Sequence, residues 1–218
     1  MKLRDRIAAA VRSVGGPPAP TREDRKNYTE KLSHLVTEEI AEELRQLGLA
    51  RVAAPPRGKD KQFMGGYGTK GVDVCLSDEK HGLLLTSGIK GLVHDPSKNL
   101  KNRYRDMAME ALELHKRFPY AVCGHLLFLG KSEALKPKVR GNFANALDEA
   151  VALLTNVSSR SRPEDAPELY ETMGIMLIEP GKPKQLDMKP AGVPRELWAA
   201  DYCTRLRDIF RARNPFYK

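Results

Sequence analysis

The sequence predicts an α/β protein in which helices flank a mixed sheet of about four or five strands. The main observation is that helical segments alternate with strand-like apolar runs along the 218 residues. Two of these runs, at 120–130 and 170–179, are almost continuously apolar. Such runs, bounded by Pro or Gly, are typical of strands covered on both faces. Two shorter runs, at 72–76 and 83–89, are joined by the polar turn SDEKHG and read as a hairpin.

The N-terminal fifth of the chain is predicted to be two helices separated by a linker. The segment GGPPAP at 15–20 cannot continue a helix, and Thr21 is a suitable N-cap for the next one. From Arg22 to Leu47 apolar residues recur at helical spacing, with glutamates among them. We therefore expect an N-terminal helix and linker over 1–20 and a single domain over 21–218.

The remaining elements follow in order. Residues 51–71 are rich in Pro, Gly and basic side chains, so we expect a mobile loop before the hairpin. Helical spacing then predicts helices over 99–118, 139–157 and 194–213, placed before, between and after the two apolar strands. The order helix, helix, strand, strand, helix, strand, helix, strand, helix favours layers of helices around one sheet.

Composition limits the class of protein. Lys and Arg total 37 against 28 Asp and Glu, a net charge of +9, which suits a partner that carries phosphates or another anionic surface. Three scattered cysteines indicate neither a disulfide framework nor a thiolate metal site. No apolar stretch reaches the roughly 18 residues that a membrane span needs. We expect a soluble cytoplasmic protein with buried thiols.

The hairpin carries the main candidate chemistry. Asp73 opens its first strand and Lys90 closes its second, so both side chains are expected at the same open end. A carboxylate and an ammonium placed in this way suit a Mg²⁺ site, with Mn²⁺ as a substitute, that directs water at a phosphodiester. The alternative is that Asp73 caps a turn and Lys90 is a solvated strand end.

The stretch GVDVCLSDEKHGLLLTSGIKG, with helices before and after it and a buried strand following, resembles the PD-(D/E)xK nuclease superfamily. The similarity is strongest over 70–130, including the helix that leads into RFPYAV. Outside this range only the architecture is similar. The resemblance implies a restriction-endonuclease-like core and a Mg²⁺-dependent DNA endonuclease of the type II restriction or another defence kind. Asp73 matches the motif Asp and Lys90 the motif Lys. The acid two residues before the Lys is replaced by Gly88, which is the main departure.

A neighbouring helix could supply the missing acid, because only the position of its oxygen at the metal matters. Glu110 borders the apolar stripe of its helix and is one candidate for a catalytic and metal-binding role; its alternative is an ordinary solvated position. Glu39 and Glu43 are the others, since the corresponding helix in the family often donates a glutamate.

Basic residues around the hairpin are candidate contacts for a nucleic-acid backbone. They are Arg57, Lys59, Lys61 and Lys70 before Asp73, and Lys98, Lys101 and Arg103 after Lys90. A solubilising loop explains the first group equally well. The sequence does not indicate which face of the protein carries the basic segment KPKVRGN at 136–142. Restriction-type enzymes usually dimerise, and the apolar face of the terminal helix with Trp198 suits either a homodimer or core packing.

Two further function classes compete with a nuclease. One is a catalytically reduced member of the same fold that only binds nucleic acid, which the glycine at position 88 favours. The other is a basic protein-interaction module with a purely structural hairpin. The chain has no GxGxxG that follows a predicted strand, and it lacks the GxxxxGK[ST], HExxH and GxSxG motifs, which argues against nucleotide-binding, zinc-peptidase and serine-hydrolase sites.

Overall fold

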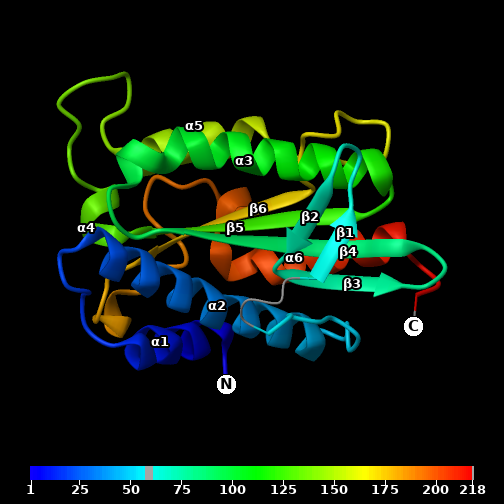
Figure 1. Cartoon of the computed structure of the whole chain (residues 1–218), viewed down its shortest axis with the longest axis horizontal. Helices are drawn as coiled ribbons and strands as arrows, with labels where there is room; N and C mark the ends of the chain where they lie inside the picture. The colour runs from blue at the N-terminus through cyan, green and yellow to red at the C-terminus, as the bar shows by residue number, and fades with distance from the viewer. Residues whose placement is uncertain (57–60, 218) are drawn as a thin grey trace.

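A computed structural model describes residues 1–56 and 61–217 (Figure 1). Its helices are α1 (Leu3–Val14), α2 (Arg22–Gln46), α3 (Pro96–Arg117), α4 (Lys131–Ala134), α5 (Ala146–Asn156) and α6 (Tyr202–Arg213). Its strands are β1 (Lys61–Met64), β2 (Thr69–Val72), β3 (Val74–Asp78), β4 (Gly82–Leu92), β5 (Val122–Gly130) and β6 (Thr172–Ile178).

The central sheet has four strands in the order β3-β4-β5-β6. The β3–β4 pair is antiparallel, and β4, β5 and β6 run parallel to one another. The predicted α/β class with a mixed sheet is therefore confirmed. All nine residues of β5 and all seven of β6 are buried, as their continuous apolar runs predict.

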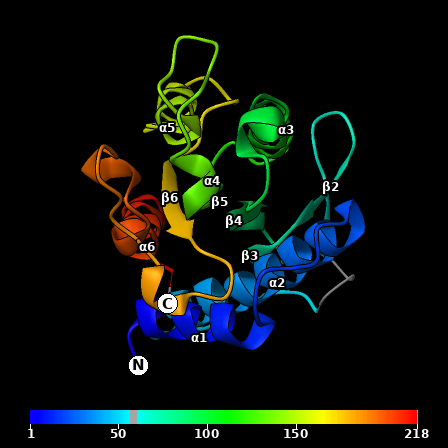
Figure 2. The ribbon, with the colours of Figure 1, turned by 90° about the vertical axis from the view of Figure 1, so that its left-hand side faces the viewer.

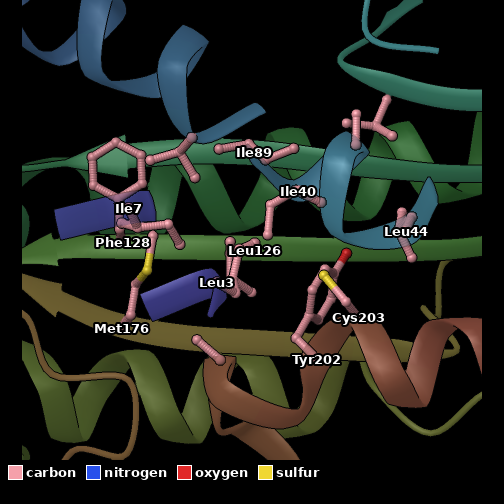
Figure 3. Packing of buried hydrophobic residues seen from close by; sticks show 14 of the residues in the cluster. Leu3, Ile7, Ile40, Leu44, Ile89, Leu126, Phe128, Met176, Tyr202 and Cys203 are labelled. Carbon is pink, nitrogen blue, oxygen red and sulfur yellow. The ribbon is translucent and has the colours of Figure 1, made fainter. Parts of the chain in front are cut away.

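Helices cover both faces of this sheet (Figure 2). One hydrophobic cluster joins the sheet to α1, α2 and α6, and a second joins the opposite face to α3 and α5. Figure 3 shows the first cluster, where Ile7, Ile40, Ile89 and Phe128 meet from four elements. Successive residues of β5 alternate between the clusters, because side chains along a strand point to opposite faces.

Three predicted segments differ from the structure. Residues 61–71, part of the expected 51–71 loop, instead form most of the β1–β2 hairpin, which ends at Val72. The turn of this hairpin docks on α3, where Glu113 Oε2 accepts hydrogen bonds from the backbone N–H groups of Tyr67 (2.6 Å) and Gly68 (3.2 Å). A tertiary contact therefore orders a segment whose composition suggests a loop.

The other two differences concern helix starts. The helix expected from 139 begins only at Ala146, because Gly141 has a φ of 103° and the Asn145 side chain caps the helix through the N–H of Asp148. The helix expected from 194 begins at Tyr202, after two 3₁₀ turns that follow Pro194. Each early boundary fails because a local turn signal overrides the apolar periodicity.

All three cysteines are buried free thiols, as expected. No helix in the described part of the chain combines the length and the apolarity that crossing a membrane demands. Trp198 lies outside α6, and its ring N–H donates to the carbonyl of Val193 at 2.9 Å. Since this side chain packs within its own chain, it gives no support to a dimer interface.

Candidate active site

Asp73 lies at the exposed edge of β4, between the end of β2 and the start of β3. Strand β3 begins opposite Ser87, so the last five residues of β4 extend beyond it. The Oδ2 atom of Asp73 accepts a hydrogen bond from the backbone N–H of Ile89 at 2.7 Å. This bond holds the carboxylate against β4 one residue from Lys90.

Lys90 is half-buried and lies on the same face of β4 as Gly88. It lines an open cleft together with Asp73. Its charge also lowers the pKa of both Glu110 and His125, which places its ammonium near these two groups on the α3 side of the sheet. Lys90 thus lies where the cleft at the edge of β4 meets the face of the sheet that α3 covers.

Gly88 leaves a space that Glu110 enters from α3. A Cβ added at Gly88 would lie 2.9 Å from Oε1 of Glu110 and 2.5 Å from Nδ1 of His125. The carboxylate therefore approaches the position where a side chain of residue 88 would stand. Burial against the sheet raises the pKa of Glu110 to about 7, with Lys90 opposing that rise and Asp73 adding to it.

His125 is a member of this site that sequence reasoning missed. It is fully buried, pairs in register with Gly88, and neither ring nitrogen has a hydrogen-bond partner among the described residues. Burial, aided by Lys90, lowers its pKa to about 3, so the ring is neutral. Only the parallel register of β4 and β5 could have revealed it, and no pattern in the sequence specifies that register.

The cleft beside Asp73 and Lys90 has a volume of about 1,210 Å³ and lies between α2 and the start of α3. Lys98 and Arg103, both predicted contacts, line it, and so do His94 and Asp95. Three basic residues that the sequence did not single out also line it: Arg22, Arg25 and Lys26. The cleft is therefore more basic than the predicted residues alone would make it.

The other predicted basic residues are spread more widely. Lys70 is close enough to Glu110 for its charge to lower the pKa of that carboxyl. Lys61 instead donates to Ser77 Oγ at 2.6 Å, and Lys101 lies 4.0 Å from Glu149 on a neighbouring surface. Arg57 and Lys59 fall outside the described residues.

Glu39 and Glu43 are not brought to this site. Both face α1, where the buried Arg6 donates to Glu39 Oε2 at 2.7 Å and to Glu43 Oε2 at 2.5 Å. Neither is among the described residues that line the cleft. The face of α2 that does line it carries Thr29, Ser33 and Thr37. The expectation that α2 supplies the missing acid through these glutamates is therefore not supported, and Glu110 is the carboxylate that approaches Gly88.

A second cluster of possible metal ligands lies deep in the core. His115, Cys123 and Glu171 place their ligand atoms within 4.8 Å of one another. However, Glu171 Oε1 already accepts from Arg160 at 2.7 Å and from Arg213 at 2.6 Å, and Oε2 accepts from the N–H of Cys123 at 2.8 Å. Two guanidinium groups would repel a cation here, so we interpret the cluster as a buried ion-pair network.

Comparisons with protein-family models, with curated proteins and with solved structures find no match to this chain. The geometry of the site and the chemistry of its side chains are therefore the basis on which a function is inferred.

Proposed function

We propose that this protein is a metal-dependent endonuclease that hydrolyses phosphodiester bonds of DNA. The observation that carries the proposal is that Glu110 approaches the space beside Gly88, next to Asp73 and Lys90. The four-stranded order β3-β4-β5-β6, with one antiparallel and two parallel pairings, is compatible with the restriction-endonuclease-like core that the sequence resembles. A role in restriction or another defence system follows from that resemblance alone.

The groups present fit Mg²⁺ or Mn²⁺. Both are hard cations that accept one or two carboxylates and fill their remaining positions with water and phosphate oxygens. Asp73 and Glu110 would supply the carboxylate oxygens, and the bound metal would polarise the phosphate and activate a water. The ammonium of Lys90 would stabilise the negative charge that develops on the phosphate oxygens. The basic side chains of the cleft would hold the nucleic-acid backbone.

One observation favours a second function, nucleic-acid binding without cleavage. Residue 88 offers no carboxylate, and the pKa of Glu110 near 7 means that its protonated form competes with a metal at neutral pH. A protein of this kind would use the same basic cleft but would turn over no substrate.

Supercoiled-plasmid cleavage in Mg²⁺ and in Mn²⁺ tests the proposal. We expect cleavage by the wild type and, for Asp73→Asn, Lys90→Met and Glu110→Gln, a loss of at least ~100-fold, since each removes a group that acts on the reacting phosphate or its metal. Glu79→Gln, the same change from glutamate to glutamine at an exposed position in the β3–β4 turn, is the matched control and should cleave like the wild type.

The outcomes separate the function classes. Cleavage that survives all three substitutions would reject this site. Binding of DNA without cleavage in either metal would favour the reduced, binding-only protein. Neither binding nor cleavage would favour a protein-interaction module.

A further inference from the structure

A second cleft adjoins the first at the carboxyl end of the parallel strands. It has a volume of about 700 Å³, and its lining residues come from the start of α3, from α4 and from the loop that leads to α5. Figure 2 shows where these three segments lie in the fold. Asp95, at the start of α3, and Lys98 line both clefts. The two hollows therefore meet over the start of α3. Ligands of open α/β sheets characteristically bind at this end of the strands.

The second cleft is also predominantly basic. Its cationic residues are Lys98, Lys101, Lys136, Lys138 and Arg140, and its anionic ones are Asp95, Glu133 and Glu149. All three acids are already paired: Asp95 with Arg25, Glu133 with Lys136, and Glu149 with Lys138. Among the described residues, no ion pair neutralises Lys98 or Arg140, and both side chains are exposed. These two cations are consequently the ones most available to an anionic ligand.

The helix end between the clefts adds to this positive potential. The first turn of α3 contains no acidic residue and begins with Pro96 at its first position. The partial positive charge of a helix N-terminus favours anions, and here it lies beside Lys98. The basic loop and the N-terminus of α3 thus both favour the binding of an anion.

The lining residues also discriminate between forms of nucleic acid. Single strands are usually held by aromatic side chains on which bases stack. Among the described residues of the two clefts, no Phe, Tyr or Trp lines the first, and Phe143 is the only one that lines the second. A surface that offers cations but almost no stacking platform suits the phosphate backbone of a duplex.

We propose that the loop of residues 135–145 and the start of α3 form a duplex-binding surface that extends the Asp73–Lys90 cleft. Lys98 and Arg140 contact successive backbone phosphates of double-stranded DNA, and the loop positions the duplex while the cleft receives the phosphate to be cut. The choice of a nucleic acid as ligand rests on the proposed function. The surface itself is defined by the second cleft and its charges.

Binding of a fluorescent 24-base-pair duplex and of one of its single strands, measured by anisotropy without divalent metal across a salt series, tests this inference. The double variant Lys98→Glu/Arg140→Glu should weaken duplex binding at least ~10-fold and reduce the slope of log K against log salt by about 2, one for each lost phosphate contact. A glutamate at position 98 is compatible with folding, because acidic residues are favourable in the first turn of a helix.

Lys80→Glu is the matched control, since Lys80 is exposed in the β3–β4 turn at the opposite end of β4 (Figure 1). It should leave the affinity and the salt slope close to those of the wild type. If the double variant behaved like Lys80→Glu, or if the wild type preferred the single strand, the inference would be overturned. Because no metal is present, these results do not depend on cleavage, so failure of the proposed nuclease activity would be seen separately.

Discussion

Gly88 is the residue on which the candidate site depends. A β-carbon there would stand 2.5 Å from His125 Nδ1 and 2.9 Å from Glu110 Oε1, both closer than ordinary van der Waals contact. The approach of Glu110 and the presence of a buried imidazole beneath it therefore both require glycine at this position. Because residue 88 of β4 has no side chain, there is room for the carboxylate that α3 supplies.

Replacing this glycine should disturb stability and activity together. We expect Gly88→Ala to lower the free energy of unfolding by about 1–3 kcal/mol, because the added methyl group overpacks a fully buried position. It should also reduce metal-dependent cleavage, since Glu110 and His125 must move. Urea unfolding and plasmid cleavage measure the two effects. Gly16→Ala is the control, because a Cβ at that position meets no atom within 4 Å; equal tolerance of both substitutions would contradict this account.

At the scale of the element, helix α2 packs against α1 on one side and lines the cleft on another. The side that carries Glu39 and Glu43 binds α1 through Arg6, whereas Thr29, Ser33 and Thr37 line the cleft beside Asp73 and Lys90. Helical periodicity identifies which residues share a face, but it does not identify the neighbour that each face meets. For this reason the glutamates of α2 could not be separated from Glu110 before the packing of α1 was known.

The ion pairs of Arg6 provide a stability prediction. Arg6→Met removes the partner of two largely buried carboxylates, so we expect a loss of about 2–3 kcal/mol in the free energy of unfolding. Urea denaturation should show this loss, whereas Arg12→Met, at an exposed position of the same helix, should change stability by less than ~0.5 kcal/mol.

The same pair of glutamates tests the assignment of the acid. Glu39→Gln and Glu43→Gln should retain wild-type cleavage per folded molecule, because their carboxylates serve the α1–α2 contact. A loss of cleavage as large as that expected for Glu110→Gln would contradict this assignment and would indicate that the two glutamates act in cleavage.

At the scale of the whole molecule, Glu171 joins segments that are distant in the sequence. Its carboxylate receives Arg160 from the loop after α5, Arg213 from α6 and the backbone N–H of Cys123 in β5. His115 of α3 lies with Nε2 at 3.3 Å from Glu171 Oε2, and its Nδ1 lies 2.9 Å from the carbonyl oxygen of Pro167. One buried carboxylate thus connects helices from both faces of the sheet.

This network gives the fold a pH dependence. Burial disfavours the charged ring of His115, but Cys123 and Glu171 more than offset burial and raise the pKa to about 10 from its ordinary 6.5. A raised pKa means that the imidazolium contributes its full stabilisation below pH 6.5 and loses it as the pH rises toward 10. For Glu171, burial is outweighed by His115, Arg213 and the N–H of Cys123, which lower the pKa, so its contribution is lost as the pH falls below 4.5.

Urea unfolding of the wild type and of His115→Gln between pH 6 and pH 10 measures the histidine contribution. The difference in free energy of unfolding should be largest near pH 6 and should shrink steadily toward pH 10. A difference that does not vary with pH over this interval would show that His115 is not charged in the folded protein.

The sequence alone determined the alternation of helices and strands, the buried character of β5 and β6, and the placement of Asp73 and Lys90 at one end of a hairpin. These features depend on local periodicity and on turn residues, which a single chain displays directly. Only the tertiary structure decided which glutamate approaches Gly88, that His125 lies beneath it, that residues 61–72 form a hairpin against α3, and that the 136–142 loop adjoins the cleft. Those facts depend on which faces pack together and in what register, and these contacts join residues that are far apart in the sequence.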